Sequence, residues 1–95
     1  MALIRRVSVP AGETVKIVPP DGGDHSGEFQ WKVLNPVGSG GAVELVDAAD
    51  KTAGEGWPLA AGAEWDTLAR DTSVFAANGG GADVEVIVTG TSYGD

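Results

Sequence analysis

The chain has 95 residues and a mass of 9.6 kDa, which suits one compact domain with a thin core. Its 14 Asp and Glu outnumber 6 Lys and Arg, the net charge is −8, and Arg5–Arg6 is the one adjacent basic pair, so we expect no nucleic-acid partner. The absence of cysteine excludes disulfides and thiolate metal sites, and no apolar stretch reaches the roughly 18 residues of a membrane helix, so no membrane partner is expected either.

Eight short runs alternate apolar with polar residues, a pattern typical of strands that bury one face. In chain order they span residues 3–9, 14–18, 28–35, 42–46, 57–59, 64–68, 74–77 and 84–90. In the clearest run, Trp31 and Val33 share one face while Lys32 lies on the other. Glycine- and proline-rich segments suited to tight turns separate the runs, and only residues 47–52 could form a single helical turn.

Strands of this length and spacing predict an all-β protein, a single antiparallel β-sandwich of about eight short strands, either Ig-like or jelly-roll-like. We expect one domain over residues 1–95, no internal repeat, and a frayed polar tail at 91–95. The inward-facing members of the runs form the expected core: Val7, Val15, Ile17, Phe29, Trp31, Val33, Val43, Leu45, Trp65, Leu68, Phe75, Val84, Val86 and Val88.

Residues with catalytic or metal-binding chemistry are sparse. The one histidine, His25, lies in a predicted loop beside Asp24 and Ser26, and three consecutive residues cannot align as a nucleophile, base and orienting acid. The carboxylates at 21–24 and at 47–50 do not have the spacing of a calcium loop. We therefore predict no enzymatic activity, no bound metal and no cofactor.

Candidate partner contacts come from two places. Trp57 lies between a glycine-rich segment and Pro58, near a predicted turn, and is expected to be partly exposed. The segment 1–6 carries apolar residues beside the adjacent arginines. It is either an arm that orders on a partner or pairs with the sheet edge of a neighbouring copy, or simply the start of a first strand at 3–9. The candidate contacts are Leu3, Ile4, Arg5, Arg6 and Trp57.

The order of strand and turn signals also resembles a known class of proteins. The stretch VSVPAGETVKI at 7–17 is followed by WKVLN at 31–35, a glycine turn, and VEL at 43–45. The block GWPLAAGAEW at 56–65, the stretch DTSVFAA at 71–77 and a last strand at 82–88 complete the order. Over residues 5–90 the chain resembles small glycine-rich β-sandwich proteins of tailed-bacteriophage virions, of the head-decoration or fibre type. The loop at 19–27 is longer and more acidic than that pattern needs.

The resemblance implies a non-enzymatic virion structural protein, most concretely a head-decoration protein that binds the capsid exterior after synthesis in the host cytoplasm. Its partner would be the major capsid protein or another virion protein, with a homo-oligomer as a further alternative. A tail or fibre component remains open, as does a carbohydrate- or host-surface-binding module that uses an exposed tryptophan. The acidic balance favours a basic protein surface as partner.

Overall fold

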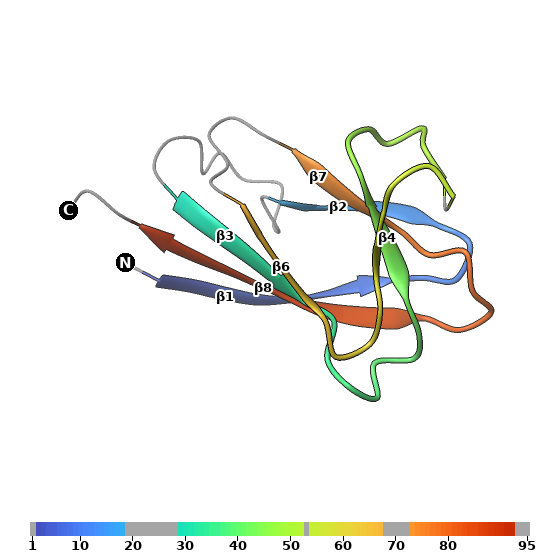
Figure 1. The fold of residues 1–95 in the computed structure, drawn as a ribbon, viewed down its shortest axis with the longest axis horizontal. Helices are drawn as coiled ribbons and strands as arrows, with labels where there is room; N and C mark the ends of the chain where they lie inside the picture. Colours follow the sequence, from blue (N-terminus) through green and yellow to red (C-terminus); the bar gives the residue numbers. More distant parts are fainter. Residues whose placement is uncertain (1, 19–28, 53, 68–72, 93–95) are drawn as a thin grey trace.

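The computed structural model describes residues 2–18, 29–52, 54–67 and 73–92 (Figure 1). Over these residues the protein is all β and contains no helix, so it has none that is long and apolar enough to cross a membrane. The strands are β1 (Ala2–Val9), β2 (Thr14–Val18), β3 (Phe29–Leu34), β4 (Val43–Val46), β5 (Trp57–Leu59), β6 (Glu64–Thr67), β7 (Val74–Ala77) and β8 (Val84–Ser92).

The observed strands confirm the alternation pattern, and their described ends lie within two residues of the expected ones. The largest difference is at β8, which continues through Ser92 because Thr91 pairs with Ala2 on one side and with Gln30 on the other. The first two residues of the expected frayed tail therefore belong to a strand, and residues 93–95 lie outside the described part. Residues 2–6 of the expected N-terminal segment lie in β1.

The strands form two antiparallel four-stranded sheets, in the orders β1-β8-β3-β6 and β2-β7-β4-β5. The first strand pairs with the last and the pairing continues inward, as β1 with β8, β2 with β7, β3 with β6, and β4 with β5. Successive pairs alternate between the sheets, which is the connectivity of a jelly roll. The all-β, sandwich-like architecture is confirmed, and its strand order matches the jelly-roll alternative.

One hydrophobic cluster contains side chains from both sheets. Trp31 and Val33 of β3 contribute from one sheet, and Leu45 of β4 and Ile17 of β2 contribute from the other. Val7, Val15 and Trp65 are partly buried against it. Most of the expected core is thereby confirmed. The cluster also contains residues outside the expected core: Val9, Val18, Leu59, Val74 and Ala76.

Strand β7 buries a different face from the one expected. Val74 and Ala76 are 6% and 0% exposed and lie in the core, whereas Phe75 between them is half-buried and outside the core cluster. The expectation that Phe75 is a core residue is therefore wrong. All four residues of the run VFAA are apolar, so the sequence does not show which phase of the alternation faces inward. The side chain of Phe29, and Leu68 entirely, lie outside the described residues.

Two buried asparagines hold the turns at the ends of the sheets. At the first, Asn78 donates from Nδ2 to the carbonyls of Val9 (2.9 Å) and Ala82 (2.8 Å). Its backbone carbonyl accepts from the N–H of Gly12 (2.8 Å), and its backbone N–H donates to the carbonyl of Glu13 (2.9 Å). We call these five residues the Asn78 corner.

At the second, Asn35 donates from Nδ2 to the carbonyls of Leu59 and Gly41, at 2.9 Å each. Its backbone carbonyl accepts from the N–H of Gly62 (2.5 Å), and its backbone N–H donates to the carbonyl of Ala63 (3.0 Å). We call these residues the Asn35 corner. Every hydrogen bond of the first corner therefore has a counterpart in the second.

The matching corners reveal that the two halves of the chain are topologically equivalent. Adding four to each strand number, and counting past eight from one again, turns β1-β8-β3-β6 into β5-β4-β7-β2, which is the other sheet read backwards. Residues 9–15 (VPAGETV) then correspond to 59–65 (LAAGAEW). The equivalence lies in the topology and in the two corners, and the sequences of the halves share little beyond an Ala-Gly turn and one asparagine.

Candidate functional site

Four of the candidate contact residues lie on β1, an edge strand. Within the described residues β1 pairs with β8 alone, in an unbroken register from Ala2–Thr91 to Val9–Val84. Ile4 is 65% exposed, and Arg5 and Arg6 are also exposed. The Leu3 backbone is paired opposite Gly90, and its side chain lies outside the described part.

The two arginines on β1 have different surroundings. Arg6 donates from Nη1 to Oε1 of Glu85 on the neighbouring strand at 3.0 Å, while Arg5 donates from Nη1 to the Ile4 carbonyl at 2.9 Å. Both contacts are exposed, so neither contributes much to stability. Charged side chains commonly protect a free edge from unwanted pairing, yet the outer backbone groups of β1, which no described residue pairs with, are of the kind that a strand from a partner can use.

The fifth candidate, Trp57, begins β5, which is an edge strand of the other sheet. It pairs with Leu45 and shares a strand face with Leu59, and both of these neighbours are buried. Trp57 itself is 64% exposed. An inward-facing position on an edge strand is thus occupied by a large aromatic side chain that the fold leaves uncovered. The structure does not bring Trp57 together with the β1 residues.

A cavity of about 390 Å³ lies beside Trp57. Its apolar wall includes Trp57, Leu45 and Val74, together with Trp65 of β6. Trp65 was expected only to complete the core, and it does pack there, but it also lines this cavity beside the exposed tryptophan. The polar part of the lining includes Asp47, Lys51 and Glu55 from the β4–β5 loop, and Ser73.

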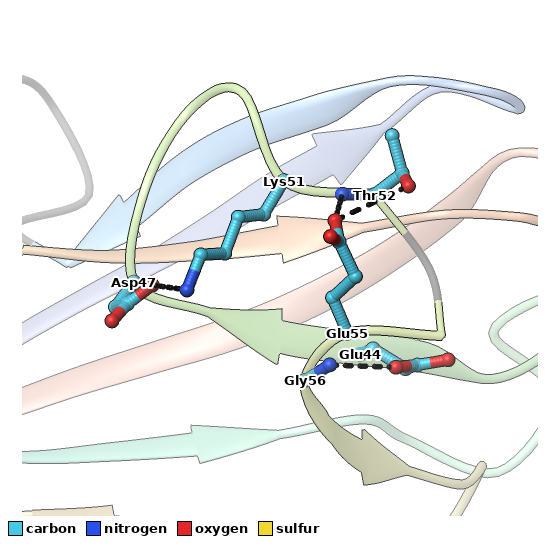
Figure 2. Close-up of polar contacts among 6 residues, drawn as sticks. All are labelled: Glu44, Asp47, Lys51, Thr52, Glu55 and Gly56. Atoms are coloured by element: carbon cyan, nitrogen blue, oxygen red, sulfur yellow. Dashed lines mark hydrogen bonds and ion pairs between the residues drawn. The ribbon is translucent and has the colours of Figure 1, made fainter.

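Hydrogen bonds hold the β4–β5 loop in place (Figure 2). The Glu44 carboxylate accepts from the backbone N–H of Gly54 (2.7 Å) and of Gly56 (3.1 Å), while Glu55 accepts from the N–H of Thr52 (2.7 Å). In the same loop, the Lys51 carbonyl accepts from the Thr14 hydroxyl at 2.9 Å, a hydrogen bond that connects the loop to β2.

Gly56 is required by the close approach of the loop to β4. A Cβ at this position would lie 2.1 Å from the Leu45 carbonyl oxygen, which is closer than real Cβ atoms come to backbone. The glycine therefore allows the chain to pass beside β4 immediately before Trp57. Together with the carboxylate contacts of Glu44, it fixes the entry of the chain into β5.

The electrostatics of the cavity rim are dominated by one ion pair. Nζ of Lys51 lies 2.7 Å from Oδ1 of Asp47. The hydrogen bond from Lys51, reinforced by its charge, lowers the pKa of Asp47, and the same contact raises the pKa of Lys51. Because the two charges compensate each other, the rim presents both donors and acceptors with little net charge from this pair.

The two halves have different residues at the equivalent positions of this edge. Trp57 stands two residues before Leu59, as Val7 stands two before Val9. Trp65 pairs with Val33 on β3, whereas its counterpart Val15 pairs with Ala76 on β7. The same scaffold positions are thus filled by valines at one edge and by tryptophans at the other. We define Trp57 and Trp65 with their cavity as the tryptophan edge.

The other sequence expectations concern metal binding. Among the described residues, no group of three or more His, Asp or Glu side chains could hold a metal ion. Asp47 is paired with Lys51, as described above. The residues Asp21, Asp24 and His25 lie outside the described part.

Two features were not anticipated from the sequence. The roles of Asn35 and Asn78 in the corners carry no sequence signal beyond an asparagine at a strand end. Val37, in the turn after β3, is 87% exposed, more than any other large hydrophobic residue described. Comparison with known proteins adds no further assignment, because the chain matches no protein-family model, no curated protein and no solved structure.

Proposed function

We propose that this chain is a structural protein of a bacteriophage virion, a head-decoration protein that attaches to the outer surface of the capsid through the β1 edge. The observation that carries the proposal is the eight-residue edge strand β1, paired on one side and bearing an apolar side chain at Ile4 that is 65% exposed. A free strand edge with an exposed apolar residue is suited to pairing with a strand of another protein.

Support also comes from the fold. The jelly-roll strand order is an architecture used by viral capsid domains, although lectins and other proteins share it. The order of motifs over residues 5–90 provides the resemblance to virion proteins. Fold and resemblance favour a structural role by analogy, and the β1 edge supplies the physical means of attachment.

The mechanism would be stabilisation by mass action. Backbone pairing along β1 would give affinity, and burial of Ile4 would remove apolar surface from water. Arg6 is compensated by Glu85 at 3.0 Å, whereas Arg5 donates only to a backbone carbonyl, so its charge would favour an acidic group on the partner strand. A protein that binds only the assembled shell shifts the equilibrium toward that shell.

Imaging of the virion tests the location. A density map of the particle is expected to show this protein on the outer head surface with β1 against a capsid subunit. Density on the tail or on a fibre, or absence of the protein from the particle, would overturn the decoration role.

A binding assay with undecorated capsids tests the edge itself. Removal of Met1–Ile4 keeps Val7 and Val9 in place, so we expect the truncated protein to fold while its co-sedimentation with capsids falls. Ile4→Ser should weaken binding in the same direction, whereas the matched variant Val37→Ser, at another exposed apolar residue, should bind as the parent does. Unchanged binding by the folded truncation would contradict attachment through β1.

A further inference from the structure

We propose that the tryptophan edge is a carbohydrate-binding site, with Trp57 and Trp65 beside the pyranose ring of a neutral hexose or N-acetylhexosamine. The juxtaposition that carries this inference is the pair of indole rings and the polar β4–β5 loop around one cavity of about 390 Å³. This edge belongs to β5 and β6, so the inference does not depend on attachment through β1.

The first argument is that the tryptophans exceed what the fold needs. At the equivalent edge of the other half, Val7 and Val15 complete the packing against the core. At the tryptophan edge, Trp65 packs in the same way, but Trp57 remains 64% exposed. A large aromatic side chain left in water, where the same scaffold uses valine, is a feature of binding surfaces.

The second argument is the chemistry of the lining. A pyranose has an apolar C–H face that stacks on an indole ring, and hydroxyl groups at its rim that both donate and accept hydrogen bonds. Asp47 and Glu55 supply acceptors, Lys51 supplies donors, and the Ser73 hydroxyl can do either. The cavity is within the range of roughly 300–1,000 Å³ that small-molecule sites occupy, and its mixture of aromatic walls with a few polar groups is characteristic of them.

The third argument is that the ion pair at the rim leaves little net charge to attract a cationic ligand. A basic side chain could stack on Trp57 through a cation–π contact, and an uncompensated carboxylate beside the ring would strengthen that binding. Asp47 is already compensated by Lys51 at 2.7 Å, and the charge of Glu55, which accepts from the Thr52 N–H, also acts on Lys51. A neutral polyhydroxylated ligand can use these groups without breaking either contact.

The fourth argument is that the loop is held before any ligand arrives. Glu44 accepts from the N–H of Gly56 (Figure 2) and from that of Gly54, and Gly56 lets the chain pass against β4. A site whose polar groups are already positioned loses less conformational entropy when it binds. The tryptophan edge is therefore pre-formed on its loop side.

The experiment uses the full chain and a printed array of neutral oligosaccharides built from hexoses and N-acetylhexosamines, followed by titration of any bound sugar with tryptophan fluorescence as the readout. We expect binding to at least one sugar class, with affinity unchanged between low and high salt. Trp57→Val, which installs the residue of the equivalent edge, is expected to weaken binding by about tenfold or more, corresponding to about 1.4 kcal/mol, with an unchanged melting temperature.

The controls separate the alternatives. Val37→Ala, a change at an exposed apolar residue outside the cavity lining, should leave sugar binding intact. Absence of binding to every sugar on the array would overturn the inference, as would equal binding by Trp57→Val. Binding of an arginine-rich peptide that depends on Trp57 and disappears at high salt would overturn it in favour of a basic protein partner.

Discussion

The Asn35 corner and the Asn78 corner are the same hydrogen-bonded device built twice from different sequences. In both, a buried asparagine donates through Nδ2 to two backbone carbonyls. Its backbone N–H and carbonyl form hydrogen bonds with a tight turn, which joins β1 to β2 in one corner and β5 to β6 in the other. Asn35 is 0% exposed and Asn78 is 2% exposed. Burial without a partner would be costly for an amide, so each corner is organised around satisfying it.

The corners differ in how the side-chain oxygen is satisfied. Oδ1 of Asn78 accepts from the N–H of Gly80 at 2.9 Å, inside a short glycine turn. Oδ1 of Asn35 instead accepts from the hydroxyl of Ser39, which also donates toward the carbonyl of Gly41 at 3.2 Å. The longer turn after Asn35 therefore uses a side chain where the shorter one uses backbone.

The comparison shows which parts of the molecule serve the fold. Features that occur in both halves, namely the asparagines and the Ala-Gly turns, hold the turns of this fold through the same hydrogen bonds. Features that occur in one half only, namely the tryptophan edge and the β4–β5 loop with its capped backbone, are free to serve binding. Breaking the symmetry in defined ways tests this division.

The largest expected effect comes from a core position where the halves differ in size. Trp31 is 2% exposed and lies opposite Gly90, while Val74 occupies the corresponding position on β7. Trp31→Ala should lower the free energy of unfolding by about 3–5 kcal/mol, because the buried indole is lost and a cavity is left in the core. Denaturant unfolding checks this value.

Trp57→Val is the matched control for that measurement, since it removes an exposed indole and should change stability by less than about 0.5 kcal/mol. A Trp31→Ala variant that unfolds like the parent protein would show that this indole is not a core element.

The two asparagines should be nearly equivalent. Asn35→Ala and Asn78→Ala each remove the side-chain amide that donates to two backbone carbonyls, and we expect each to destabilise the protein by about 2–4 kcal/mol. The two values, measured under the same conditions, should agree within about 1 kcal/mol. A large loss at one corner with none at the other would mean that the corners do not share a structural role.

The turn glycines should give a smaller and again paired effect. Gly12 and Gly62 have φ values of 78° and 91°, a region that other residues adopt at a cost of about 1–2 kcal/mol. A Cβ at Gly62 would also come within 3.2 Å of the Val37 side chain, so Gly62→Ala should be at least as destabilising as Gly12→Ala. Gly81→Ala, where a Cβ would meet nothing within 4 Å, is the control for thermal melting. A melting temperature unchanged by both turn substitutions would contradict the shared geometry.

The smallest expected effect belongs to the β4–β5 loop, which has no counterpart in the other half. Lys51 lowers the pKa of Asp47, so the stabilisation from this carboxylate is present above its unfolded pKa and is lost as pH falls through the lower folded pKa. The raised pKa of Lys51 works in the opposite direction, because its contribution is lost as pH rises through the folded value.

Asp47 is largely exposed and Lys51 partly exposed, so Asp47→Asn should change the melting temperature little at neutral pH and slightly flatten its fall below about pH 4. Melting curves over the acid range compare the variant with the parent. A pronounced destabilisation at neutral pH would contradict this expectation and indicate that the ion pair is needed for the loop conformation.

Much of this protein could be predicted from its sequence, because strand alternation and glycine turns are local signals. The eight strands, the inward positions of Trp31 and Val33, and the exposure of Trp57 all follow from residues adjacent in the chain. Local signals failed at Phe75, because the apolar run VFAA does not show which phase of the strand faces inward.

Tertiary structure alone decided which distant segments meet. Nothing local indicates that Asn78 contacts Val9 across 69 residues, or that Trp57 and Trp65 line one cavity. It also separated the candidate contacts, with β1 at an edge of one sheet and Trp57 at an edge of the other. The physical reason is that alternation fixes which way a side chain faces, whereas the pairing of strands depends on long-range burial and on satisfying buried polar groups.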